Sequence, residues 1–241
     1  MSREATERVE AVLLDAFGTL VTIEPPGPHL RAELAARGVE VTEESATAAF
    51  RAEIGYYLAH HLDGRDAASL DDLRDRCAQV IVDALDAPAV ELPTAKDAML
   101  AALRFSAFAD AAPALRALRR RGLRLVVASN WDASLAEVLE RAGLGPLVDA
   151  VVSSAEVGAP KPAPELFAAA LERAGVPASR ALHVGDSIAG DVEGARAAGL
   201  RTVLMVRDDP LGAAVRALQG PPQGAPAVPT IGDLRELRSL V

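Results

Sequence analysis

Short apolar segments alternate with amphipathic segments along the second half of the chain. Apolar runs predict strands at 123–130, 148–154, 181–186 and 201–206. Apolar residues at every third or fourth position predict helices at 113–122, 134–143, 164–175 and 191–199. A glycine ends each of these helices, where a left-handed residue is common: Gly122, Gly143, Gly175 and Gly199. Strands that are apolar throughout and alternate with helices predict an α/β fold, a doubly wound parallel sheet with helices on both faces.

The first hundred residues depart from this alternation. A further strand is predicted at 9–15, and after Pro25-Pro26-Gly27 the pattern becomes helical and stays helical to about residue 105. We therefore expect an α/β core formed by 1–24 and 106–241, with a helical domain inserted at 25–105.

Composition narrows the class of protein. The net charge is −9 with no block of lysine or arginine, which argues against nucleic acid and against an anionic membrane surface as partners. No apolar run approaches the length of a membrane span, and the N-terminus has no apolar core of a signal peptide. A single cysteine, Cys77, excludes an internal disulfide and suits a reducing compartment. We expect a cytoplasmic protein, and the sequence predicts no particular oligomeric state.

Polar side chains stand where the predicted strands of the core end. They are Asp15, Ser129, Asn130, Asp186 and Asp191, with Lys161 between two prolines ahead of a helix. The carboxyl ends of parallel strands meet at one edge of the sheet, so these groups can converge on one crevice. Three carboxylates against one ammonium leave an excess of negative charge, and oxygen ligands of this kind suit Mg²⁺.

A divalent cation, a lysine and backbone amides together make a receptor for a phosphoryl group. Asp15 beside the cation is the natural in-line nucleophile, which would form an aspartyl-phosphate. The residues themselves therefore predict a Mg²⁺-dependent hydrolase acting on a small phosphorylated metabolite.

The same residues resemble the four motifs of the haloacid dehalogenase (HAD)-like hydrolases. The matching segments are DAFGT from Asp15 to Thr19, VVASN with Ser129, GAPKPAPELF with Lys161, and GDSIAGD from Asp186 to Asp191. Single motifs of this length are weak signals, whereas four in order at strand ends are specific. The resemblance spans essentially the whole chain, because the helical insertion corresponds to the cap domain that the family places after its first motif. It implies the Rossmann-like core of that family.

The resemblance also implies roles for individual residues. Mg²⁺ would be held by Asp15, the backbone carbonyl of Phe17, Asp186 and, through water, Asp191. The phosphoryl oxygens would be bound by Ser129 and Lys161, with further substrate contacts from Asn130 and Thr19. Backbone amides of residues 16–18 and of Asn130 would add donors.

Phe17 is the departure from the family's pattern, since its phosphatases usually carry a second aspartate there. That aspartate protonates the leaving oxygen, a contribution of roughly 10²–10⁴-fold that a phenyl ring cannot make. Three interpretations follow: a Mg²⁺-dependent phosphatase with another proton donor or a good leaving group, a metal-independent 2-haloacid dehalogenase, and a catalytically weak protein that binds a phospholigand or a partner. Two acids in GDSIAGD disfavour the dehalogenase, because such enzymes replace the first with a neutral residue. Candidates for a replacement proton donor in the cap are Tyr56, Tyr57, His60 and His61, although packing between helices or exposure to solvent also explains each of them.

Overall fold

The core of the molecule is a parallel six-stranded sheet with strand order β5-β4-β1-β6-β7-β8. The computed structural model describes residues 8–85, 90–218 and 227–241. The sheet strands are β1 (Ala11–Leu14), β4 (Arg124–Ser129), β5 (Ala150–Ser153), β6 (Ala181–Gly185), β7 (Arg201–Met205) and β8 (Thr230–Ile231). β1 lies between β4 and β6, so the strand order reverses beside it. In an open α/β sheet this reversal is where ligands bind.

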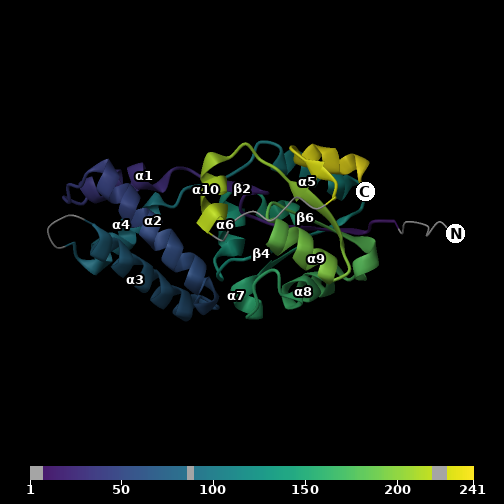
Figure 1. Cartoon of the computed structure of the whole chain (residues 1–241), viewed down its shortest axis with the longest axis horizontal. Helices are drawn as coiled ribbons and strands as arrows, with labels where there is room; N and C mark the ends of the chain where they lie inside the picture. The colour runs from purple at the N-terminus through teal and green to yellow at the C-terminus, as the bar shows by residue number, and fades with distance from the viewer. Residues whose placement is uncertain (1–7, 86–89, 219–226) are drawn as a thin grey trace.

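Helices cover both faces of this sheet (Figure 1). They are α5 (Ala111–Arg120), α6 (Leu135–Arg141), α7 (Ser154–Val157), α8 (Pro164–Ala174), α9 (Gly194–Ala197) and α10 (Pro210–Leu218), with a short η5 turn at Leu234–Ser239. Successive residues of β1 point to opposite faces, so Val12 and Leu14 pack with α5, α6 and η5, whereas Ala11 and Leu13 pack with α8 and α9. The continuously apolar strands are thus explained by burial on both sides, and the predicted α/β class is confirmed.

The inserted segment forms a separate layer of four helices at one end of the molecule (Figure 1). These are α1 (Pro26–Ala35), α2 (Glu43–His60), α3 (Ala67–Ala84) and α4 (Leu92–Ala102), which we call the helical cap. They pack around a hydrophobic cluster of their own, centred on Phe50, Leu73, Ile81 and Met99. A two-stranded antiparallel sheet of β2 (Val21–Ile23) and β3 (Phe105–Ala107) joins the two ends of the cap to the core. This arrangement supports our proposal that the cap domain extends from residue 25 to residue 105.

The predicted elements lie close to the observed ones, with one informative exception. The four helix-ending glycines have positive φ angles of 71–81°. The segment after β6, however, does not begin as an α-helix. It starts with a π-helical turn, η4 (Ile188–Glu193), and only then continues as α9. The extra residue of this turn directs the side chain of Asp191 towards β6. The pattern of apolar positions does not reveal such a turn.

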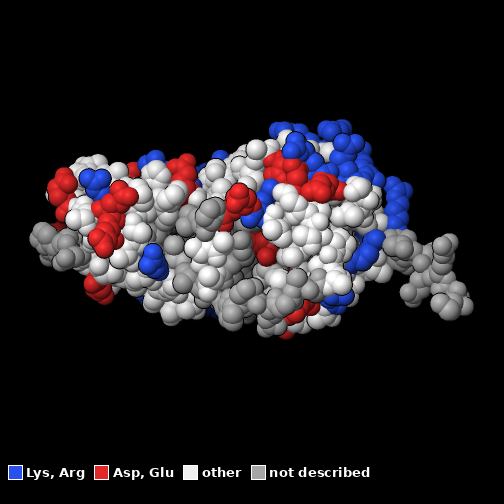
Figure 2. Space-filling view, turned by 45° about the horizontal axis from the view of Figure 1, so that its top comes forward, with Lys and Arg blue, Asp and Glu red and all other residues white. Residues whose placement is uncertain are grey.

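Charged side chains are unevenly distributed over the surface. Figure 2 shows a group of basic side chains over α5 and η5, where the exposed arginines are Arg116, Arg119, Arg120, Arg121, Arg235 and Arg238. Among the described residues, none of the helices combines the length and the apolar character needed to cross a bilayer.

Candidate active site

The carboxyl ends of β1 and β4 bring Asp15 and Ser129 together, and Asp15 also contacts Lys161. Asp15 follows β1 directly and is 5% exposed, and its Oδ1 accepts a hydrogen bond of 2.9 Å from Ser129 Oγ at the end of β4. Lys161, in the loop between α7 and α8, places its Nζ 2.5 Å from the same oxygen. A buried carboxylate at a strand tip is therefore paired with an ammonium and a hydroxyl.

Lys161 is held in this position through its backbone. Its N–H donates to Asn130 Oδ1 at 2.7 Å, and its carbonyl accepts from Asn130 Nδ2 at 3.1 Å. The side chain of Asn130 is thus engaged with the lysine loop. A substrate contact through the Asn130 backbone amide stays a prediction.

Asp191 lies on the other side of Lys161 and is completely enclosed by donors. Its Oδ1 is 2.6 Å from Lys161 Nζ and 2.8 Å from His183 Nε2, and its Oδ2 accepts the backbone N–H of Ser187 at 2.9 Å. The π-helical turn brings Asp191 against Gly185, where a Cβ would lie 2.1 Å from the Asp191 Cγ. A glycine at the end of β6 is therefore required for this approach.

Burial and charge act in opposite directions on these groups. Burial raises the pKa of Asp15, an effect that Lys161 opposes and the charge of Asp191 reinforces. Burial also opposes ionisation of Asp191, but Lys161 and His183 outweigh it and lower the pKa of Asp191. Burial would lower the pKa of Lys161, yet the two carboxylates hold it above its ordinary value. Lys161 is a fixed cation.

The donor set fits a divalent cation. Asp15, Asp186 and Asp191 each offer a carboxylate oxygen within 4.8 Å of the others. With all three ionised, Lys161 leaves a net charge of −2, which a divalent ion would balance. Hard oxygen donors of this kind are the ligands that Mg²⁺ prefers. Asp15, Asp186 and Asp191 are thus the side chains that would hold it.

The turn after Asp15 uses some of the groups that the sequence assigned to substrate. Gly18, with a φ of 76°, donates its N–H to Val21 O at 2.9 Å. The prediction that this amide is free to bind the substrate is therefore wrong. Thr19 is fully buried, and its carbonyl accepts from Arg207. Its hydroxyl lies outside the hydrogen-bond network of Asp15, and its substrate contact stays a prediction. Phe17 is half-buried and packs against the core cluster.

A cleft of about 350 Å³ lies between this edge and the helical cap. The carboxyl edge of the sheet contributes Phe17 and Asn130, and α2, α3 and α4 contribute the opposite wall. Of the replacement proton donors considered from the sequence, Tyr57 lines this cleft. Tyr56 and His60 stack on each other instead, with ring centroids 4.0 Å apart.

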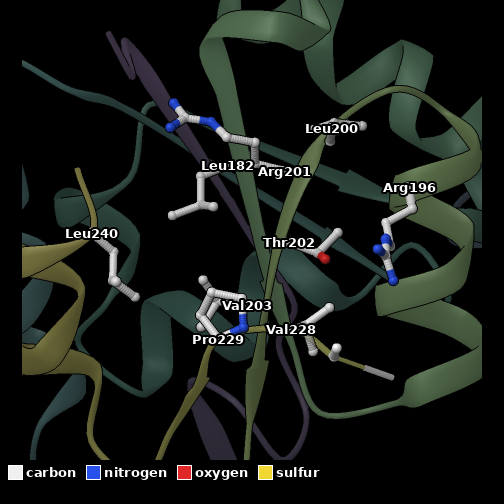
Figure 3. A pocket seen from close by; sticks show the side chains of 10 residues that line it. Leu182, Arg196, Leu200, Arg201, Thr202, Val203, Val228, Pro229 and Leu240 are labelled. Carbon is white, nitrogen blue, oxygen red and sulfur yellow. The ribbon is translucent and has the colours of Figure 1, made fainter. Parts of the chain in front are cut away.

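A second cavity, of about 380 Å³, lies beside β6 and β7 (Figure 3). Its walls include the aliphatic side chains of Leu182, Val203 and Leu240, and the residues described around it include no carboxylate, thiol or imidazole. The charged residues described around it are Arg196 and Arg201, so the cavity offers neither a carboxylate nucleophile nor a carboxylate metal ligand.

Comparison with known proteins decides the family. A family model described as haloacid dehalogenase-like hydrolase matches residues 9–199, which is most of the chain. The chain is a haloacid dehalogenase-like hydrolase. The resemblance inferred from the four motifs is thereby confirmed.

Relatives of this hydrolase include named phosphatases. It is 44% identical to haloacid dehalogenase-like hydrolase domain-containing protein 3 of Mus musculus over 102 residues. This matched region is 42% of this chain and 41% of the relative. The chain is 38% identical over 135 residues to phosphoserine phosphatase of Thermus thermophilus, covering 56% and 51%. The matches thus span about half the length of these relatives, or less. The crystal structure of a HAD phosphatase from Thermococcus onnurineus matches with a TM-score of 0.64 and 26% identity, over 96% of this chain and 97% of that one.

Asp191 is supported by two groups that the sequence did not assign to the site of this hydrolase. His183 of β6 is fully buried, and its Nε2 lies 2.8 Å from Asp191 Oδ1. A histidine inside an otherwise aliphatic strand was the available signal. The donation from Ser187 depends on the π-helical turn and left no signal in the sequence.

A buried carboxyl group in the cap of this hydrolase also escaped prediction. Glu53 of α2 is 5% exposed and lines the cleft. Burial raises its pKa to about 7, and a hydrogen bond with the thiol of Cys77 opposes the shift only in part. The other titratable or charged residues that line the cleft are Tyr57, Arg74, Cys77, Asp132, Glu137 and Arg141. The pKa of the Cys77 thiol is also raised, mainly by burial and secondly by the charge of Glu53.

Replacing Glu53 by glutamine is expected to stabilise the protein at pH 8 and to change little at pH 5. The folded chain retains a proton on Glu53 that the unfolded chain loses above pH 4.5, so Glu53 makes stability fall as the pH rises from about 4.5 to about 7. This difference in the pKa of Glu53 between the folded and the unfolded chain lowers the free energy of unfolding by about 3 kcal/mol once the pH exceeds both values. Urea unfolding at both pH values measures it. Glu40→Gln, at an exposed position, is the matched control. Equal stability changes at pH 5 and pH 8 would mean that Glu53 does not titrate between them.

Proposed function

We propose that this protein is a Mg²⁺-dependent phosphatase that hydrolyses a small phosphate monoester through an aspartyl-phosphate at Asp15. The observation that carries the proposal is the contact of Asp15 with Ser129 and Lys161 at the reversal of strand order, with Asp186 and Asp191 within ligand distance. The phosphatase names among its relatives support the same class of reaction. The cytoplasm as its compartment is part of the proposal.

In this proposal each residue has one task in the reaction. An oxygen of Asp15 attacks the phosphorus atom as the ester P–O bond breaks, and the leaving alkoxide takes a proton from water to become the alcohol. Water then attacks the phosphorus of the aspartyl-phosphate, which releases inorganic phosphate and restores Asp15. Lys161 and Ser129 donate hydrogen bonds to the phosphoryl oxygens during both steps. A bound Mg²⁺ would neutralise charge on the acids and the phosphoryl group, allowing two anions to approach each other.

The pocket chemistry disfavours the 2-haloacid dehalogenase. A haloacid would bring its carboxylate against Asp186 and Asp191 as well as the nucleophile, and Lys161 already pairs with two of these acids. A catalytically weak phospholigand-binding protein is the third outcome that an assay must separate.

Phosphate release from 4-nitrophenyl phosphate is expected to require Mg²⁺ and to fall by at least about 100-fold in EDTA, because the ion stabilises charge in the transition state by several kcal/mol. Asp186→Asn should shift half-saturation to higher Mg²⁺ concentrations, whereas Asp97→Asn on the exposed cap surface should not. Chloride release from 2-chloropropionate without Mg²⁺ would identify a dehalogenase. Release of neither phosphate nor chloride would favour the phospholigand-binding protein.

A further inference from the structure

The cleft between the cap and the catalytic edge has an unusual lining for this chain. The sequence contains eight aromatic residues, five Phe, two Tyr and one Trp. Four of them line this one cleft: Phe17, Tyr57, Phe105 and Trp131. Phe105 and Trp131 pack with ring centroids 5.2 Å apart. Aromatic rings therefore gather beside the proposed reaction centre and leave most of the remaining core to aliphatic side chains.

The cap contributes mainly aliphatic side chains to the same cleft. They are Ile54 and Leu58 of α2, Leu73 of α3, Met99 and Leu100 of α4, and Leu103 directly after α4. The polar atoms of the lining are partly engaged already. Trp131 Nε1 donates to Ser134 Oγ at 3.3 Å, and Tyr57 Oη accepts the backbone N–H of Asp132 at 3.4 Å.

The lining of the cleft includes two buried acids, Glu53 of the cap and Asp132 after β4, which are 5% and 6% exposed. Glu137 and Arg141 line it but are exposed, and Arg74 is half-buried. Glu53 is the buried acid of the cap wall, beside the Cys77 thiol. A second phosphate would need buried cations, whereas the buried charged groups of this lining are acids. A sugar would need several hydroxyl partners, and Tyr57 brings the one hydroxyl among the described lining residues of the cap wall. An apolar group needs only the rings and aliphatic side chains that are present.

We propose that the cleft binds the alcohol portion of the substrate, and that this portion is an apolar alkyl or arylalkyl group. Phe17 and Asn130 join the cleft to the catalytic edge, so a phosphoryl group at Asp15 would direct its ester substituent into it. A cavity of roughly 150 Å³ with aliphatic walls accommodates benzene, so about 350 Å³ has room for a phenylalkyl group. This inference rests on the proposed phosphatase and names its substrate class.

Binding of alkylphosphonates in the presence of Mg²⁺, measured by isothermal titration calorimetry, tests the inference without requiring turnover. From ethyl to hexyl, the Kd is expected to fall about two- to fourfold for each added methylene group, because each is transferred from water to an apolar wall. 2,3-Dihydroxypropylphosphonate should bind no more tightly than ethylphosphonate. A Kd independent of chain length, or tighter binding of the dihydroxy or an ω-amino compound, would overturn the proposal.

Two leucines of α4 provide a matched pair of variants. Both are half-buried and pack against the cap cluster, but Leu100 lines the cleft whereas Leu92 is not among its lining residues. Leu100→Gln should weaken the dependence of Kd on chain length, and Leu92→Gln should preserve it. Equal effects of the two would count against the cleft as the binding site.

Turnover separates this inference from the proposed function. Hydrolysis of 4-nitrophenyl phosphate that depends on Mg²⁺ and Asp15, combined with a flat chain-length series, would refute the apolar substrate alone. Tight, chain-length-dependent binding without any turnover would refute the phosphatase and retain the apolar ligand.

Discussion

Replacing Asp15 by asparagine is expected to abolish phosphate release, with a loss in kcat of at least about 10⁴-fold, as removal of a covalent nucleophile does elsewhere. An amide has no anionic oxygen to form the aspartyl-phosphate. Its oxygen can still accept the hydrogen bond from Ser129, and Lys161 keeps its ion pair with Asp191. The fold should therefore persist while the chemistry is lost.

Steady-state kinetics with 4-nitrophenyl phosphate and circular dichroism of the same preparations measure these two consequences. Asp97→Asn makes the same chemical change at an exposed position of α4 and should leave both unchanged. Phosphate release by Asp15→Asn at more than a few per cent of the original rate would exclude Asp15 as the nucleophile. Loss of the folded signal would instead assign Asp15 a structural role opposite Lys161.

Much of the fold was predictable because the strands are short, apolar and separated by helices with clear ends. The residue at the end of each strand can be predicted with them, which is why the sequence alone places Asp15 and Ser129 at one edge of the sheet. The contact between Asp15 and Lys161 joins positions 146 residues apart, and only the shared edge of a parallel sheet makes it predictable.

The supporting interactions were not predictable for equally physical reasons. The enclosure of Asp191 depends on a π-helical turn and on the missing Cβ of Gly185, neither of which alters apolar periodicity. The hydrogen bond from Gly18 to Val21 removes a donor that the motif alone suggests is free. The cleft requires the side-chain packing of α2, α3 and α4 against the core, and amphipathic patterns do not specify which helices meet.

Replacing Phe17 by aspartate is expected to raise kcat for alkyl phosphates by about 10²–10⁴-fold relative to Phe17→Asn, because the new carboxyl group can protonate a poor leaving group. The gain requires that a fraction of this carboxyl group be protonated at the pH of the assay. Phe17→Asn has nearly the same size and polarity but no proton to transfer. Phe17→Asn is therefore the control for losing the phenyl ring, which both variants remove from the core cluster and from the cleft.

The dependence on leaving group distinguishes proton donation from a general improvement of the site. 4-Nitrophenolate departs without a proton, so the ratio of Phe17→Asp to Phe17→Asn should be small for its ester and should grow as the alcohol becomes less acidic. A pH profile should show the gain declining as the new carboxyl group ionises. Equal kcat values for the two variants across the series would mean that another group already protonates the leaving oxygen. Tyr57 and Glu53, which line the same cleft, would then be the side chains to replace.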